Sequence, residues 1–210
     1  MNQDKEQALT LELLEAIEER EDLTQRHLAR RLGVALGLAN SYLKRCVRKG
    51  LVKIQQAPAN RYLYYLTPKG FAEKSRLTAR YLSYSFEFYR RAGDDYLRVY
   101  ADCVERGQMT TLLCGLSELA EIASLKAVEA GVEIAGFYDA RAIEDRFLRQ
   151  PVWRSLDDAH EAAAYVVTDL VDPLEMFAQL KRWTSADRIH VPEVLGLIHG
   201  GRGEKRFRAG

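Results

Sequence analysis

The stretch "LLCGLSELAEIASLKAVEAGVEIAGFYDAR", residues Leu112 to Arg141, carries the clearest structural pattern in the chain. A short apolar run is followed by a glycine turn, an amphipathic segment and a second apolar run that ends in an acid. This pattern predicts a buried strand, a helix that stops at Gly131, and a second strand. A strand, a helix and a strand in this order form a crossover unit whose strands lie parallel.

The glycine turn matches a dinucleotide-binding fingerprint in part. The three glycine positions of that fingerprint hold Gly115, Ser117 and Ala120. A serine hydroxyl at the middle position can cap the helix or donate to a phosphate oxygen. Glu118 opposes an anion, whereas Asp139 stands where an acid holds ribose hydroxyls. These five residues are the candidate effector site. The alternative for Asp139 is that it ends the strand and caps a helix that follows.

Further strands and helices are predicted after residue 141. The runs "QPVW", "AAYVVTDL" and "DRIHVP" predict strands, and helices are expected around residues 156–162 and 173–183. Strands that alternate with helices imply a parallel sheet. We therefore expect residues 93–210 to form an α/β Rossmann-like domain with a parallel sheet. The final stretch "GGRGEKRFRAG" is expected to be a flexible basic tail.

Charge is distributed unevenly along the chain. Residues 1–92 contain 17 Lys and Arg against 10 Asp and Glu, whereas residues 93–210 contain 14 against 20. Within residues 23–92 the count is 15 against 2. Such a local excess of positive charge attracts phosphate backbones, and a merely solvated basic face would carry interspersed acids. The first part of the chain is therefore expected to bind nucleic acid.

Three helices and a hairpin are predicted before residue 67. Apolar periodicity marks a helix around residues 11–17, a second that follows the cap residue Thr24 and stops at Gly33, and a third over about residues 36–49. The runs "LVKIQQ" and "RYLYYLT" predict two strands joined by a turn at residues 57–60. Together they indicate that residues 1–92 contain an α+β winged helix-turn-helix.

The third predicted helix carries most of the candidate DNA contacts. Its outward face carries small and polar side chains at the start and cationic side chains further along. This order suits the major groove, because amides read base edges and cations hold phosphates. Two hairpin cations extend this surface. The candidate DNA-binding residues are Gly37, Asn40, Ser41, Lys44, Arg45, Arg48, Lys53 and Arg61.

Residues 8 to 90 resemble the winged-helix domain of MarR-type transcriptional regulators. The stretches "LTQRHLARRLGV", "LKRCVRKGLVK" and "YLYYLTPKGFAEKSRLTARYL" are most similar to a group associated with bacterial exopolysaccharide gene clusters. In that group the matching helix often opens with serine and carries an early lysine, where this chain has Ala35 and Leu38. The resemblance implies a regulator of transcription that binds double-stranded DNA and acts in exopolysaccharide gene control.

The second domain is similar to two kinds of protein. One is the Rex-type redox-sensing repressor, which pairs a winged helix with an NAD(H)-binding Rossmann domain. The other is a small Rossmann-like domain of bacterial polysaccharide-modifying enzymes, which binds nucleotide sugars and is closer in the spacing of its motifs. The implied effector is a nucleotide sugar or NAD(H). The alternative is an α/β domain without a ligand that supports oligomerisation or serves as a scaffold.

A long helix is predicted between the two domains. Thr67 and Pro68 begin it, and it is expected to run to about residue 91. A homodimer seam is predicted along this helix, because helix-turn-helix proteins usually bind paired half-sites as dimers; its residues are Leu77, Tyr81, Tyr84 and Phe88. The alternative is that this stripe covers the wing or the second domain. The stretch "RAGDDY" is expected to be a hinge.

Several classes of protein are disfavoured by the sequence. No apolar run approaches the roughly 20 residues of a membrane span, and the start lacks the features of a signal peptide, so a cytoplasmic location without membrane contact is expected. The three cysteines and four histidines show no metal-ligand spacing, and the cysteines lie in contexts typical of buried thiols. No residue pair is arranged as nucleophile and base. We expect no enzyme, with a Rossmann enzyme fused to a DNA-binding domain as the less favoured alternative.

Overall fold

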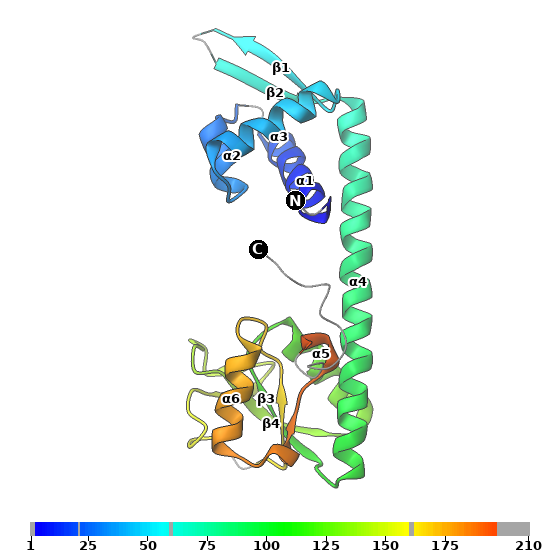
Figure 1. Ribbon diagram of the computed structural model, residues 1–210, viewed down its shortest axis with the longest axis vertical. Coiled ribbons are helices and arrows are strands. Elements are labelled where there is room, and N and C mark those ends of the chain that lie inside the picture. Colours follow the sequence, from blue (N-terminus) through cyan, green and yellow to red (C-terminus); the bar gives the residue numbers. More distant parts are fainter. Residues whose placement is uncertain (1–2, 21, 59–60, 160–161, 197–210) are drawn as a thin grey trace. The chain divides into compact units, whose positions relative to one another are not determined.

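The computed structural model describes residues 3–20, 22–58, 61–159 and 162–196. The chain divides into two compact units, Met1–Phe86 and Glu87–Gly210, and Figure 1 shows their elements. The division falls within one helix, α4 (Pro68–Glu105), and the boundary predicted after residue 92 lies further along the same helix. The turn residues Ala59 and Asn60 and the basic tail, residues 200–210, lie outside the described residues.

The first unit is a winged helix-turn-helix. It contains α1 (Gln3–Glu19), α2 (Gln25–Arg31), α3 (Leu36–Arg48), the antiparallel strands β1 (Val52–Ala57) and β2 (Arg61–Leu66), and the beginning of α4. The predicted helix ends are confirmed: the Thr24 hydroxyl accepts a hydrogen bond from the His27 amide at 3.1 Å, and Gly33 has a φ of 60°. Leucines of α1 and α2 pack around the buried face of α3, which includes Tyr42.

A single helix, α4, covers the region for which a helix to about residue 91 and then a hinge are predicted. It begins as expected, with the Gly70 amide donating to Thr67 Oγ1 at 3.0 Å. It then continues through "RAGDDY", where Ala92 and Tyr96 are fully buried and the Asp95 carboxylate accepts from the Val194 amide at 2.6 Å. These contacts outweigh the roughly 1 kcal/mol that a glycine costs inside a helix. The predicted break in the helix is therefore wrong.

The second unit is an α/β domain with a mixed, mostly parallel sheet, which confirms the predicted fold class. Its strands are β3 (Thr110–Cys114), β4 (Glu133–Tyr138), β5 (Arg146–Phe147), β6 (Gln150–Trp153), β7 (Ala164–Val167) and β8 (Ile189–His190). Their order is β5-β6-β4-β3-β7-β8, and the β5–β6 pair alone among the described strands of this sheet is antiparallel. The five parallel strands have the order of the doubly wound Rossmann-like fold, with β3 as the first strand.

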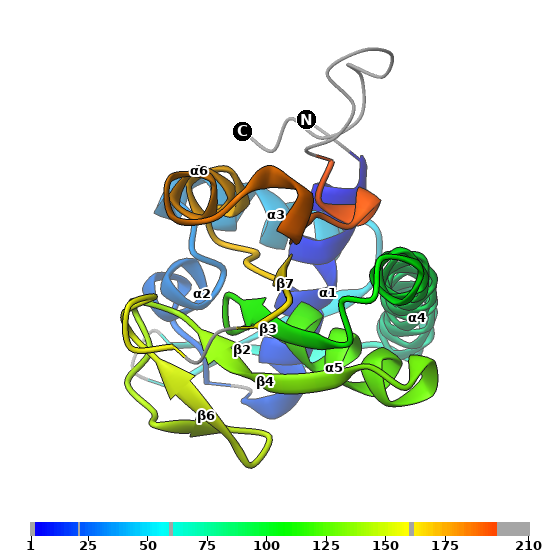
Figure 2. The same cartoon turned by 90° about the horizontal axis from the view of Figure 1, so that it is seen from below.

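Helices cover both faces of this sheet (Figure 2). The later part of α4 and α5 (Glu118–Ala130) bury one face, and α6 (Pro173–Trp183) packs on the other. Two short 3₁₀ helices, η1 (Ala186–Arg188) and η2 (Glu193–Leu195), flank β8. All three cysteines are buried thiols. Among the described helices, none combines the length and the hydropathy of a bilayer-spanning segment.

The helix predicted around residues 156–162 is wrong. The described part of this segment forms turns, while residues 160 and 161 lie outside the description. Among the described residues of this segment, Leu156 and Ala162 alone are buried, and Asp157 and Asp158 are exposed. Without an apolar face to bury, so short a helix has too little tertiary packing to be stable.

Candidate DNA-binding face and effector site

Four of the predicted DNA contacts lie on one exposed line of α3. Gly37, Ser41, Lys44 and Arg48 follow each other at helical spacing and are all exposed. The line begins with small residues: Ser41 Oγ donates to the Gly37 carbonyl at 2.9 Å, and open space surrounds the position of a Cβ on Gly37. It ends with two cations whose side chains form no ion pair within the described part of the chain. Such a line allows close approach at one end and phosphate contact at the other.

Asn40 lies beside this line and is half-buried. Its Oδ1 atom is shielded from solvent and has no hydrogen-bond partner among the described residues. The residue lines a cavity of about 240 Å³ between α3 and the hairpin, together with Gln25, Arg48 and Ile54. A buried amide oxygen without a partner is unfavourable, so a donor that enters this cavity would satisfy it.

Arg45 differs from the other predicted contacts. Its guanidinium forms an ion pair with Glu6 of α1 and lies 5.2 Å from the centroid of the Tyr42 ring. These contacts hold the side chain against α1, away from the exposed line. Arg45 therefore supports the packing of α3 on α1.

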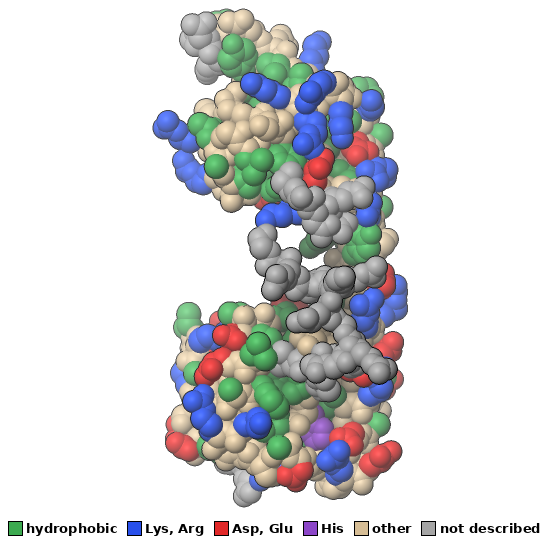
Figure 3. All heavy atoms as spheres, viewed as in Figure 1, with side chains coloured by type: hydrophobic (Ala, Val, Ile, Leu, Met, Phe, Trp, Pro, Cys, Tyr) green, Lys and Arg blue, Asp and Glu red, His purple; other side chains and the backbone are tan. Residues whose placement is uncertain are grey.

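The charges around α3 leave its outward face positive. Three acids of α1 (Glu6, Glu18 and Glu19) form ion pairs with Arg45, Lys74 and Arg31, none of which belongs to the exposed line. Lys53 on β1 is exposed, whereas the side chain of Arg61 is outside the description. Figure 3 shows lysine and arginine side chains gathered over this unit. These three acids are thus engaged away from the exposed line.

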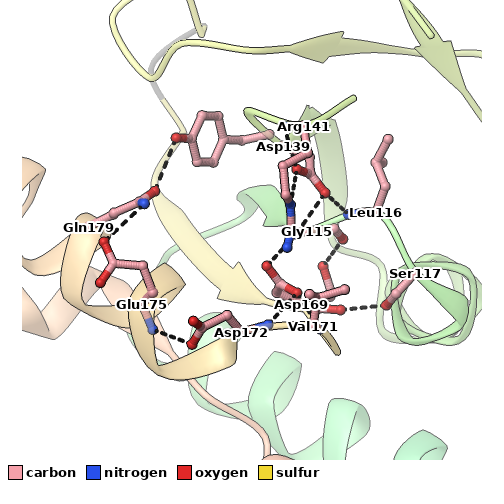
Figure 4. Close-up of polar contacts among 12 residues, drawn as sticks. Gly115, Leu116, Ser117, Asp139, Arg141, Asp169, Val171, Asp172, Glu175 and Gln179 are labelled. Carbon is pink, nitrogen blue, oxygen red and sulfur yellow. Dashed lines mark hydrogen bonds and ion pairs between the residues drawn. The ribbon is translucent and has the colours of Figure 1, made fainter. Parts of the chain in front are cut away.

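The glycine turn of the second unit is fastened to the neighbouring strands. Figure 4 shows the turn at the carboxyl ends of β3, β4 and β7. The Gly115 amide donates to the Tyr138 carbonyl at 2.8 Å, and its carbonyl accepts from Thr168 Oγ1 at 2.6 Å. Gly115 has a φ of 108°, and a Cβ there would lie 2.5 Å from the Asp169 Cα. Glycine is therefore required at this position because Asp169, two residues after β7, approaches so closely.

Ser117 closes the same turn from the side of the helix. Its hydroxyl accepts from the Leu119 amide at 3.1 Å, as an N-cap, and donates to the Thr168 carbonyl at 2.5 Å. Glu118 is exposed at the first position of α5, and Ala120 is fully buried against the sheet. The serine thus performs the capping role that the sequence suggests. Its hydroxyl hydrogen is engaged with the Thr168 carbonyl, which lies directly after β7.

Asp139 is 4% exposed and is held by several donors. Its carboxylate accepts from the amides of Leu116 (3.0 Å) and Arg141 (2.9 Å) and from the Arg141 guanidinium (3.0 Å), which also donates to Asp169 at 2.5 Å. Burial by itself raises the pKa of Asp139, but the hydrogen bonds from Arg141 and Leu116 outweigh it and the pKa is lowered. Residues 142–145 form no helix, so the alternative role as a helix cap is wrong.

Two backbone amides at this turn already have acceptors within the chain. The Leu116 amide is bound by Asp139 and the Leu119 amide by Ser117. A phosphate that binds the Leu116 amide would have to replace the Asp139 carboxylate there. Arg141, Thr168 and Asp169 were missed by the sequence analysis, although Asp169 follows a strand just as Asp139 does. The carboxyl ends of parallel strands meet at one edge of the sheet. Two aspartates that each follow a strand, Asp139 and Asp169, could therefore have been expected to lie close together.

Residues 7–53 match the family model described as winged helix-turn-helix DNA-binding. The PcaV transcriptional regulator from Streptomyces coelicolor is similar at 25% identity over 47% of this chain and 74% of that chain, with a TM-score of 0.39. MepR, a transcription regulator of the Staphylococcus aureus multidrug efflux pump MepA, is similar at 24% identity over 39% of this chain and 60% of that chain, with a TM-score of 0.34.

A third likeness extends over both units. Human N-acetylserotonin methyltransferase aligns at 12% identity over 90% of this chain and 74% of that chain, with a TM-score of 0.32. No curated protein matches the sequence. All three TM-scores are below 0.5, so the assignment depends on the family match and on the elements themselves. By that match and by its three helices and hairpin, the first unit is a winged helix-turn-helix domain of the DNA-binding class.

Proposed function

We propose that the protein is a transcriptional regulator that places α3 in the major groove of double-stranded DNA. The observation that carries this proposal is the exposed line of α3, where Lys44 and Arg48 form no ion pair in the described structure while acids of α1 are bound elsewhere. The family match over residues 7–53 supports it. The resemblance of residues 8 to 90 to MarR-type regulators supports the finer proposal of a role in exopolysaccharide gene control.

Selection of duplexes from a random pool by the full-length protein tests this function. We expect one sequence to be enriched and then bound roughly 10³-fold more tightly than random DNA in a fluorescence anisotropy titration at physiological salt. Equal affinity for enriched and random duplexes would contradict regulation through sequence-specific binding.

Replacing the two cations of the line should weaken binding to every sequence alike. Lys44→Ala or Arg48→Ala removes one phosphate contact, so the slope of log affinity against log salt should become about 0.9 units shallower. Arg45→Ala is the matched control in the same helix, because its guanidinium is engaged with Glu6. We expect Arg45→Ala to leave the salt slope unchanged, and a slope reduced equally by all three would show that the line does not define the contacts.

Asn40→Ala should act on sequence preference. If the Asn40 amide reads a base edge, its loss should reduce the preference for the enriched sequence over random DNA by about 1–3 kcal/mol, with little change on random DNA. Anisotropy titrations on both duplexes measure the two effects. A uniform loss on both would assign Asn40 to the backbone instead.

The second part of the proposal is a homodimer formed along α4. Tyr81 (62% exposed), Tyr84 (53%) and Phe88 lie on one exposed stripe. Leu77 is predicted to be part of this seam, but it is buried in the core of the first unit and is not available to a second copy. An almost wholly apolar cavity of about 220 Å³ opens beside Tyr81 and Tyr84, against Leu11 of α1. A side chain of a second copy would fill such a hollow and bury aromatic surface.

Glutamate at both Tyr81 and Tyr84 should therefore produce a folded monomer. Burying two charges in an apolar seam is unfavourable, and a monomer engages one half-site instead of two. Sedimentation velocity measures the mass, and operator titration measures the loss of affinity. Leu82→Glu, an exposed position on another face of the same helix, is the control that should stay dimeric. A dimer that persists in the double variant would place the interface elsewhere.

For the second unit we propose a nucleotide-type effector, a nucleotide sugar or NAD(H), at the carboxyl edge of the sheet. The strand order and the position of Gly115, Ser117 and Asp139 at that edge support this, and Glu118 and Ala120 lie in the first turn of α5 beside them. The alternative is a ligand-free scaffold, and a specific observation favours it: the Leu116 and Leu119 amides already have acceptors within the chain.

Ligand-dependent unfolding of the full-length protein separates these two readings. NAD, NADH, UDP-glucose and coenzyme A are added in turn at constant ionic strength, and tryptophan fluorescence follows the unfolding. Both tryptophans, Trp153 and Trp183, belong to the second unit, so this signal reports on that unit. A raised midpoint with one class supports an effector site. An unchanged midpoint with all four favours the scaffold.

A further inference from the structure

The first turn of α3 exposes two leucines beside the line that the proposed function places in the major groove. Leu36 is 45% exposed and Leu38 is 37% exposed. Gly37 stands between them, and neighbours along a helix differ in direction by about 100°. The two leucines therefore flank the start of the line, one on each side. Single exposed leucines are common on protein surfaces, but this pair borders the point of closest approach.

The polar groups near this turn are few. The helix has Ala35 at its N-cap without a side-chain hydrogen bond, and Gly37 carries no side chain. Ser41 uses its proton on the Gly37 carbonyl. The cations Lys44 and Arg48 follow two and three turns later, where they suit phosphates. The leading end of α3 thus offers the DNA mainly apolar side chains.

The floor of the major groove presents one apolar substituent, the 5-methyl group of thymine. We propose that Leu36 and Leu38 contact thymine methyl groups, so that the bound DNA requires thymine opposite the first turn of α3. This inference rests on the proposed function and names the chemistry that this end of the recognition helix selects. The occupant is the DNA itself, because the leucines are continuous with the cationic line on the same helix.

Deoxyuridine provides the test, since it differs from thymidine only by the missing methyl group. Each thymine of the enriched duplex is replaced in turn by deoxyuridine, and the affinity of the full-length wild-type protein is measured by anisotropy. We expect about four-fold weaker binding at one or two positions, because burial of one methyl group is worth about 0.8 kcal/mol. All base-pairing groups remain unchanged.

Leucine variants identify which side chain meets which methyl group. Leu38→Ala should abolish the difference between thymine and uracil at one position, and Leu36→Ala at the other. Leu125→Ala, an exposed leucine of α5, is the matched control and should keep both differences.

Three outcomes count against the inference. If no single replacement of thymine by deoxyuridine changes the affinity for the enriched duplex, the inference is overturned and the proposed function stands. A uracil effect that persists in both leucine variants also overturns it, since other residues would then contact the methyl groups. If no duplex is enriched at all, the proposed function and this inference fail together.

Discussion

A valine in place of Gly115 is expected to destabilise the α/β unit by about 3–5 kcal/mol, which is enough to unfold it at moderate temperature. The φ of 108° is strained for any residue with a Cβ, and most of all for a β-branched one. In addition, the new Cβ would lie 2.5 Å from both the amide nitrogen and the Cα of Asp169. These are backbone atoms, so no side-chain rotation can relieve the contact. Urea unfolding followed by tryptophan fluorescence measures the loss in this unit.

Gly131→Ala separates the two causes. Gly131 ends α5 with a φ of 71°, yet no heavy atom lies within 4 Å of a Cβ built there. This variant should lose only the conformational part, about 1–2 kcal/mol. If both variants lose the same amount, the close approach of Asp169, two residues after β7, is not what requires glycine at position 115. A valine variant that is far less stable than Gly131→Ala assigns the difference to the contact with the Asp169 backbone.

Asp139→Asn is expected to lower the free energy of unfolding by about 2–4 kcal/mol at neutral pH. The substitution removes the charge that accepts from the Arg141 guanidinium and leaves that guanidinium with Asp169 alone. The amide NH₂ group that replaces one carboxylate oxygen would face a donor, either from Arg141 or from the Leu116 backbone. Urea unfolding of both proteins at pH 7 gives the difference.

The same comparison at lower pH tests the origin of the effect. The pKa of Asp139 is lowered in the folded protein, so the unfolded chain takes up a proton first as the pH falls. The stability that the carboxylate contributes is therefore fully present above the pKa of the unfolded chain and is lost as the pH falls through the folded pKa. The difference between wild type and Asp139→Asn should stay constant from pH 7 down to the pKa of an unfolded aspartate, about 4, and shrink below it. Asp158→Asn, at an exposed aspartate, should stay within about 0.5 kcal/mol at every pH.

Local features of this protein were readable from the sequence because each depends on residues within one helical turn. Thr24 and Ser117 cap the amides two or three residues ahead, and Gly33 and Gly131 adopt positive φ just after a helix. The strands of both units, apart from β5, follow from short apolar or alternating runs. The fold class could therefore be predicted, as could Gly37, Ser41, Lys44 and Arg48 on the exposed line of α3, whereas the partial burial of Asn40 and the ion pair of Arg45 with Glu6 could not.

Contacts between distant segments decided what the sequence could not. "RAGDDY" contains a glycine and two acids and is typical of a break, yet it is helical because Ala92 and Tyr96 are buried against the sheet and Asp95 is bound by the Val194 amide. Leu77 has the spacing of a seam residue but is buried within its own unit. Periodicity shows that a face is apolar, and only packing shows what covers it.

The carboxyl edge of the α/β sheet shows the same division most clearly. From the sequence, Gly115 and Asp139 look like parts of a phosphate and ribose site, because residue type and spacing are the same whether a ligand or the protein fills the turn. In the structure, Asp169 approaches Gly115 and shares Arg141 with Asp139, and Thr168 bonds to the turn from β7. These partners come from three strands far apart in the chain. Which donor meets which acceptor there is set by the order of the parallel strands, since that order alone brings their carboxyl ends to one edge.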